Sequence, residues 1–118
     1  MEIRLDKSKN IAYIKIIGEA NSKEILSAFD EAVSSKDYRK GMGRLWDFTE
    51  IDLASLEKNV IPEMSRYPTK FPTGIRDVKV AFVVSKSLEY GLTREFQAYS
   101  EIYAKSQVRI FTKLVEAE

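Results

Sequence analysis

Carboxylates gather in one short stretch of the sequence, where Asp47, Glu50 and Asp52 occupy three of six positions. Paired carboxylates can serve as general acid and general base in a hydrolytic or transfer reaction. These three, however, flank a predicted junction between a strand and a helix, where acidic side chains cap the helix and interact favourably with its positive end. The stretch therefore indicates helix capping rather than catalysis.

Trp46 and Asp47 are two candidates for ligand or partner binding, because Asp47 stands at the carboxyl end of a predicted interior strand. Open α/β sheets bind ligands outside that end of their strands. The Asp47 carboxylate could instead cap the next helix or pair with a basic neighbour. The Trp46 indole, whose N–H needs a partner when buried, could instead pack in the core or in an interface. The sequence leaves both alternatives open.

Arg94 is the third candidate, early in a predicted helix that runs from about residue 88 to residue 104. The planar guanidinium fork of arginine fits a carboxylate or a phosphate of a ligand or partner. The structural alternative is an ion pair within the chain, with Asp47 or with a residue near Glu95. The sequence alone does not decide between these roles.

Missing residue types exclude several classes of chemistry. The chain of 118 residues contains no cysteine and no histidine, which rules out disulfides, Cys or Ser–His nucleophiles and metal sites that need these ligands. Ser85-Lys86-Ser87 could hold an anion on helix N–H groups, but it lacks the glycines of a phosphate loop, so Ser87 is predicted to be a helix cap. We therefore expect no catalytic residue, no metal, no cofactor and no enzymatic activity.

Charge is spread evenly along the chain. Nineteen basic and eighteen acidic side chains leave a net charge of +1, and neither half carries the dense basic stripe of a nucleic-acid-binding protein. No apolar run approaches the ~20 residues that a membrane span needs. We expect a cytoplasmic protein that neither binds nucleic acid nor spans a membrane. A solvated rim is predicted for Arg66, Lys70, Arg76 and Lys79.

Hydrophobic periodicity predicts one α/β domain over residues 1–118. The chain opens with a hairpin and continues with alternating helices and strands, which implies a mixed, mostly parallel sheet of about five strands. One helix is predicted from an Asn21 cap to about Lys36, and another from Asp52 to Phe71 with a break near Pro62. Strands are predicted at residues 3–5, 11–17, 44–49, 78–84 and 107–111, and further helices at 88–104 and from 113 onward.

This element order and several local segments resemble the SpoIIAA-like branch of the STAS-like fold, often labelled STAS/SEC14-like. The segments are Gly43–Phe48, Val80–Val84, Tyr90–Phe96, Val108–Thr112 and Glu116-Ala117. Proteins of this branch are mostly uncharacterised small bacterial proteins. The resemblance implies a STAS-like fold and a non-enzymatic regulatory or interaction module, which docks to a protein partner and associates with itself as a homodimer.

The chain departs from true anti-sigma-factor antagonists after its third predicted strand. Those proteins begin the next helix with Asp-Ser-Ser-Gly-Leu, whose second serine is phosphorylated. Here the most similar segment is Asp52-Leu53-Ala54-Ser55-Leu56, with Ala54 at the acceptor position. Alanine cannot carry a phosphate, so the resemblance implies a module without that switch. Ser55 is a displaced acceptor or, alternatively, a serine in the first turn of the helix.

A carrier of a small apolar or carboxylate ligand is the alternative function. It would hold the ligand beneath the second and third predicted helices. The break at Pro62, the loop Pro68–Gly74 and the possible carboxylate clamp Arg94 favour this hypothesis. A ligand retained by the purified protein would distinguish a carrier from a module that only docks to proteins.

Overall fold

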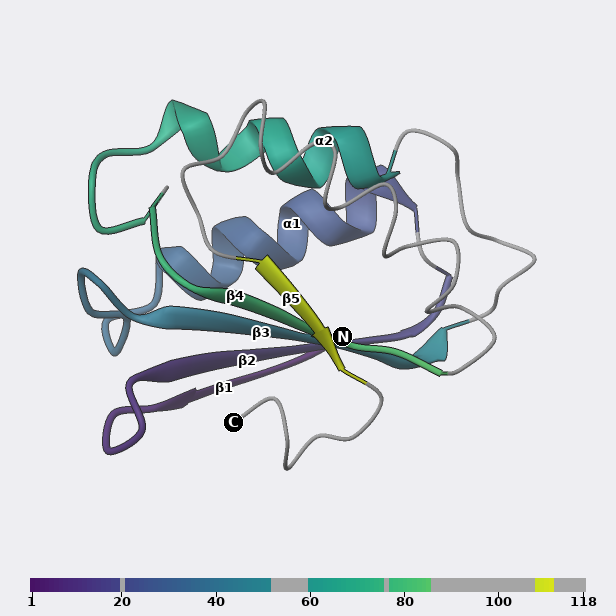
Figure 1. Cartoon of the computed structure of the whole chain (residues 1–118), viewed down its shortest axis with the longest axis horizontal. Helices are drawn as coiled ribbons and strands as arrows, with labels where there is room; N and C mark the ends of the chain where they lie inside the picture. The colour runs from purple at the N-terminus through teal and green to yellow at the C-terminus, as the bar shows by residue number, and fades with distance from the viewer. Residues whose placement is uncertain (20, 52–59, 76, 86–107, 112–118) are drawn as a thin grey trace.

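The computed structural model describes residues 1–19, 21–51, 60–75, 77–85 and 108–111. Within them, five strands form one sheet in the spatial order β1-β2-β3-β4-β5 (Figure 1). The strands are β1 (Glu2–Asp6), β2 (Ile11–Gly18), β3 (Gly43–Ile51), β4 (Val80–Val83) and β5 (Val108–Phe111). β1 is antiparallel to β2, and every other neighbouring pair is parallel. The predicted α/β class, with an opening hairpin and a mostly parallel sheet, is confirmed.

The Asp6 carboxylate holds the turn of the opening hairpin. Its Oδ1 atom accepts hydrogen bonds from the Ser8 hydroxyl at 2.7 Å, the Ser8 N–H at 3.0 Å and the Lys9 N–H at 3.1 Å. The Ser8 hydroxyl bond is the main reason that the pKa of Asp6 lies below its ordinary value. Asn10 ends the turn with a φ of 56°, a left-handed conformation that asparagine tolerates better than most residues.

Helix α1 (Ser22–Val33) begins at the predicted cap, where Asn21 Oδ1 accepts a hydrogen bond from the Glu24 N–H at 2.8 Å. It ends before Lys36, the predicted end, because the Ser35 N–H turns to the Ala32 carbonyl at 3.3 Å and closes the last turn tightly. Among the described residues, no helix has the length and apolar character required to cross a bilayer.

The second predicted helix appears as α2 (Val60–Arg66) followed by the 3-10 helix η2 (Tyr67–Lys70). The described helix continues through Pro62, so the predicted break at that residue is wrong, and the change of helix type comes at η2. Pro68 stands in the first turn of η2. Since proline has no N–H to continue an α-helical ladder, the chain tightens there before Phe71. The predicted start at Asp52, and the predicted helices at 88–104 and from 113 onward, lie outside the described residues.

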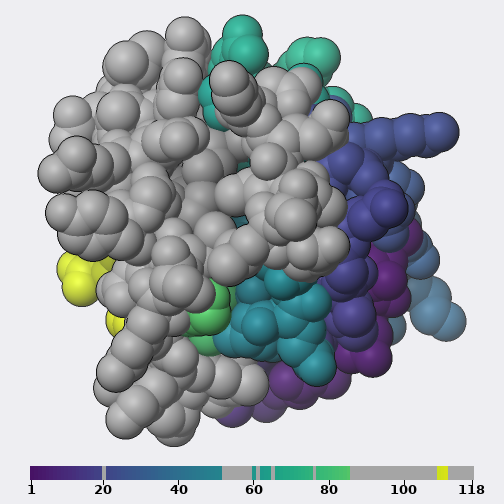
Figure 2. Space-filling view, turned by 90° about the vertical axis from the view of Figure 1, so that its right-hand side faces the viewer, coloured from purple at the N-terminus to yellow at the C-terminus, as the bar shows by residue number. Residues whose placement is uncertain are grey.

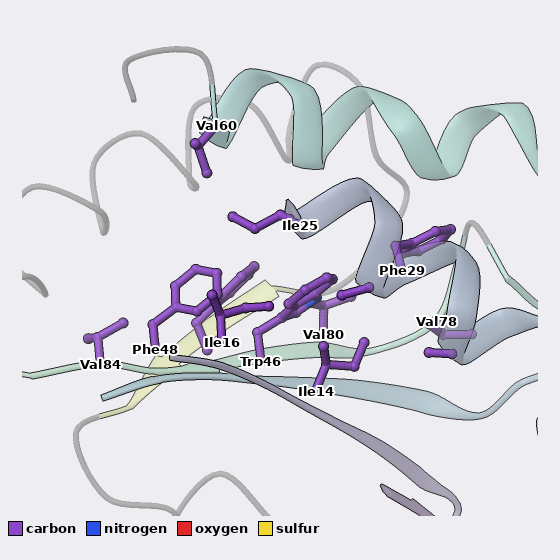
Figure 3. Packing of buried hydrophobic residues seen from close by; sticks show 13 residues of the cluster. Ile14, Ile16, Ile25, Phe29, Trp46, Phe48, Val60, Val78, Val80 and Val84 are labelled. Atoms are coloured by element: carbon purple, nitrogen blue, oxygen red, sulfur yellow. The ribbon is translucent and has the colours of Figure 1, made fainter. Parts of the chain in front are cut away.

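Helices α1 and α2 pack on the same face of the sheet (Figure 1). Strands β2, β3 and β4 follow one another in a single direction, and right-handed crossovers then place both connecting helices on one side. Figure 3 shows side chains from the sheet directed toward side chains from these helices. This main core includes Ile14, Ile16, Ile25, Ala28, Phe29, Ala32, Trp46, Phe48, Val60, Val78, Val80, Phe82 and Val84.

The opposite face of the sheet, called the outer face below, is also buried over its central strands. Leu45 lies there with Tyr13 and Val83, while Phe48 of the same strand faces the helices. Leu45 is 2% exposed and Phe48 is 1% exposed, so β3 is covered on both faces, as expected of the interior strand predicted there. The fourth strand is shorter than predicted, since its ladder begins at Val80.

Neighbouring isoleucines in β2 give a matched test of this packing. Ile16 is completely buried and Ile17 is 49% exposed. We predict that Ile16→Ala lowers the free energy of unfolding by about 2–5 kcal/mol, because it leaves a cavity in the core. Ile17→Ala should change it by less than about 0.5 kcal/mol. Urea unfolding of both variants measures the difference, and equal losses would contradict the burial of β2 described here.

Candidate functional site

The structure places Trp46 and Asp47 on opposite faces of β3. Trp46 is 3% exposed and belongs to the main core, with its ring centroid 6.0 Å from that of Phe48. Asp47 is partly exposed on the outer face, and its Oδ1 atom accepts hydrogen bonds from the Thr49 N–H at 3.0 Å and the Thr49 hydroxyl at 2.6 Å. Arg94 lies outside the described residues, so binding by these three residues together stays a prediction.

A cluster of charged side chains surrounds Asp47 near the carboxyl-terminal edge of the parallel strands. Lys15 lies opposite Glu2 and Asp47 in the sheet and forms an ion pair with Glu50. The hydrogen bond that Lys15 donates to the Glu50 carboxylate is the main cause of the raised pKa of Lys15, and the charges of Asp47 and Glu2 add to it. Figure 2 faces this edge, where the end of β3 reaches the surface in teal. Asp47 and Glu50 therefore belong to a surface charge cluster, and Asp52 lies outside the described residues.

Potential metal ligands do not gather in the part of the chain that the structure describes. Across those residues, no group of three or more Asp, Glu, His or Cys side chains is arranged to hold a metal ion. Glu50 is engaged with Lys15, and Asp47 is engaged with Thr49. The described structure thus gives these acids partners within the chain.

A groove of about 710 Å³ opens at the other edge of the sheet, where the parallel strands begin. Its walls come from the turn between β1 and β2, from residues 40, 41 and 43 at the start of β3, and from residues 73, 74 and 77–79 before β4. These three connections meet at the left of Figure 1. Its floor extends onto the outer face of the sheet. We refer to this cavity as the amino-edge groove.

Small residues on adjacent strands create the hollow. Side chains alternate between the faces of a strand, so Gly43 and Leu45 share the outer face of β3. Gly43 lies opposite Ile11 of β2, and Ala81 lies between Leu45 and Arg109 in the neighbouring row. With only a hydrogen atom at Gly43 and a methyl group at Ala81, the floor is low there. Larger apolar side chains border it: Ile11, Leu45 and Phe111.

Four exposed cationic residues line the amino-edge groove: Lys9, Lys40, Lys79 and Arg109. Asp77 is the carboxylate in its described lining. Within the described chain, no ion pair joins Lys40, Lys79 or Arg109 to a carboxylate. The described lining of the groove therefore carries a strongly positive charge, although the whole chain is nearly neutral.

The loop before β4 has a conformation that fixes both Asp77 and Lys40. Asp77 Oδ1 accepts a hydrogen bond from the Gly74 N–H at 2.7 Å. Gly74 has a φ of +95°, and a Cβ atom there would overlap the Lys40 side chain. The missing side chain at Gly74 thus leaves room for the aliphatic part of Lys40. Gly41, next to Lys40, donates its N–H to the Gly74 carbonyl at 2.8 Å and joins the two walls.

Arg44 connects the same two walls from inside the protein. Its side chain is 3% exposed, and one terminal nitrogen donates to the Ile75 carbonyl at 2.6 Å and to Tyr38 Oη at 3.4 Å. Tyr38 in turn donates to the Met42 carbonyl at 3.3 Å. The guanidinium carbon lies 4.8 Å from the Phe29 ring centroid. Burial lowers the pKa of Arg44, and the hydrogen bonds and aromatic face compensate for lost water.

The amino-edge groove has no counterpart among the predictions from sequence. Lys79 appears there only as part of a solvated rim, and the other cations of the groove do not form a group in the sequence. They are far apart along the chain and meet because parallel strands begin at one edge. A usable signal was present, however. Lys9, Lys40 and Lys79 each stand one to three residues before a strand of the parallel part of the sheet.

Replacing Arg44 should loosen both walls. We predict that Arg44→Met, which keeps much of the side-chain length but donates no hydrogen bond, lowers the free energy of unfolding by about 1–3 kcal/mol. Hydrogen exchange should accelerate at Gly41, whose N–H joins the walls. The exposed Arg39 offers the control Arg39→Met, with a change below about 0.5 kcal/mol. Unchanged stability and exchange in Arg44→Met would refute this role.

The amino-edge groove is the candidate functional site, because it combines a hollow and an apolar floor with three cations, Lys40, Lys79 and Arg109, that have no carboxylate partner in the described chain. Concave sites with apolar walls and a few polar groups are typical of ligand binding. No protein-family model, curated protein or solved structure matches this chain.

Proposed function

We propose that this chain is a non-enzymatic regulatory or interaction module of the SpoIIAA-like type, with a STAS-like fold, and that it acts through the amino-edge groove. The local segments that resemble this branch support the proposal. So does the described element order, in which the hairpin is followed by α1, β3, α2 and β4. Ala54 in place of the phosphorylated serine favours a module that works without that switch.

Cations around an apolar hollow are the observation that carries this proposal. Lys40, Lys79 and Arg109 have no ion pair with a carboxylate in the described chain, although acidic residues are almost as numerous as basic ones overall. Positive side chains that gather around a concavity attract a partner of opposite charge. The geometry therefore favours recognition of an acidic partner.

Binding rather than catalysis is the use that the described lining favours. Asp77 supplies the carboxylate there, and Gly74 engages one of its oxygens. General acid–base chemistry needs a group within hydrogen-bonding reach of the reacting proton and a pKa near the working pH. Lysine and arginine side chains instead provide fixed positive charge, which recognises an anion without reacting with it.

Two kinds of partner follow from the sequence and remain alternatives. A protein partner, including a second copy of this chain, follows from the resemblance to interaction modules. A small apolar or carboxylate ligand follows from the carrier hypothesis. The volume of the groove, about 710 Å³, favours the second, because small-molecule sites commonly measure about 300–1,000 Å³.

Photo-crosslinking tests the proposal in cells that produce the protein. Benzoylphenylalanine replaces Thr73 on the groove wall or, as a control, Glu31 on the exposed side of α1. We expect an adduct from position 73 that is absent from position 31. Lys79→Glu should reduce the yield about tenfold, because it reverses a charge of the groove. Lys23→Glu on α1 should leave the yield unchanged.

The mass of the adduct identifies the partner as a second copy, another protein or a small molecule. Equal crosslinking from positions 73 and 31, or a yield that does not respond to Lys79→Glu, would refute the groove as the working surface. Turnover of a bound compound by the pure protein would refute the non-enzymatic part of the proposal.

A further inference from the structure

We propose that the amino-edge groove binds a small amphipathic anion: an oxyanion, carboxylate or phosphate, attached to an apolar body. This inference rests on the proposed function, because it names the ligand class of the same groove. The ligand would place its head group among the cations of the rim and its apolar body on the floor. The apolar floor, the positive rim and the backbone of the loops each support this class.

The apolar body is favoured by the floor of the groove. Ile11, Leu45 and Ala81 belong to the apolar cluster on the outer face, and Phe111 also lines the groove. Ile11, Ala81 and Phe111 remain partly exposed. Covering them with an apolar group removes hydrocarbon surface from water, which is favourable. A purely hydrophilic anion would leave this surface uncovered.

The negative head group is favoured by the charge of the rim. Lys79 precedes β4 and stands two residues before Ala81, and Arg109 lies opposite Ala81 on the neighbouring strand β5. Lys40 approaches from the loop before β3, where its aliphatic part lies against Gly74. With no carboxylate paired to these three cations in the described chain, an oxyanion would supply their counter-charge.

Side chains, and not the backbone amides of the loop glycines, are the proposed ligands of this head group. The Gly41 N–H donates to the Gly74 carbonyl, the Gly43 N–H to the Asn10 carbonyl, and the Gly74 N–H to Asp77. The glycines of the loops therefore have no backbone donor left for a ligand. This distinguishes the groove from phosphate loops, in which successive backbone N–H groups hold the anion. Affinity should consequently respond strongly to charge reversal of single side chains.

Four probes with the same ten-carbon chain test the ligand class: decanoate, decyl phosphate, decanol and decylammonium. Each is titrated below its micellar concentration into the full chain, and backbone amide shifts are followed by NMR. We expect the anions to shift the amides of Gly41, Gly43 and Thr73, which line or border the groove. They should bind at least about tenfold more tightly than decanol, and decylammonium should bind least. Tighter binding of decanoate would indicate a carboxylate site, and tighter binding of decyl phosphate would indicate a phosphate site.

Variants locate the site. Lys79→Glu and Arg109→Glu should each weaken the better anion about tenfold, whereas Lys23→Glu on α1 should have no effect. Ala81→Leu should abolish binding, since the larger leucine side chain fills the hollow. Thermal melting establishes that each variant is folded, and the two charge reversals at exposed positions keep the test decisive even if Ala81→Leu does not fold.

Equal binding of decanol and decanoate would overturn the anionic head group, and anion binding without shifts in the groove would overturn the location. Absence of binding by all four probes would overturn the ligand class. In each case crosslinking from position 73 still judges the proposed function separately. If the groove crosslinks to a protein but binds none of the four probes, the ligand class is wrong and the chain is a module that docks to a protein.

Discussion

Burial of the Arg44 guanidinium constrains the whole amino-terminal edge of the sheet. A cation withdrawn from water is costly unless hydrogen bonds and polarisable neighbours replace the lost hydration. Here the Ile75 carbonyl, the Tyr38 hydroxyl and the ring of Phe29 do so. Two of these partners belong to the loops that form the walls of the groove. A change in the conformation of either loop would therefore leave the buried guanidinium without a hydrogen-bond acceptor. The free-energy cost of that loss keeps both walls in place beside β3.

The two ends of the parallel strands offer different means of binding an anion. Helices that follow parallel strands begin near the carboxyl-terminal edge, where their N–H groups favour negative charge. Helices end near the opposite edge and present carbonyl oxygens, which repel an anion. A site for anions at the amino-terminal edge must therefore rely on charged side chains. Lys40, Lys79 and Arg109 provide such charge in this protein.

The fold could be predicted further than the site because periodicity is a local signal. Alternation in Ile11–Ile17 and the Asn21 cap identify their elements from neighbouring residues alone. The predicted end of α1 was less accurate, because the hydrogen bond from the Ser35 N–H to the Ala32 carbonyl competes with one more helical turn. The groove depends on residues about thirty to forty positions apart. Their proximity follows from strand order, which a search for linear motifs does not reveal.

Strand β3 shows the same limit at single residues. Trp46 and Asp47 are adjacent in sequence, and general experience with α/β sheets favours ligands near this part of a strand. The alternation of the strand separates them, with one side chain in the core and the other on the outer face. Sequence reasoning could identify both as chemically notable but could not assign them a common site.

Each wall of the groove is a separate connection between consecutive elements, while the core lies beyond Arg44 on the helical face of the sheet. Selectivity can therefore change by exchanging one connection at a time. A longer segment before β4 would narrow the entrance, and a neutral residue in place of Lys9 would reduce the demand for negative charge. Such a scaffold can acquire a repertoire of specificities while its hydrophobic interior stays the same.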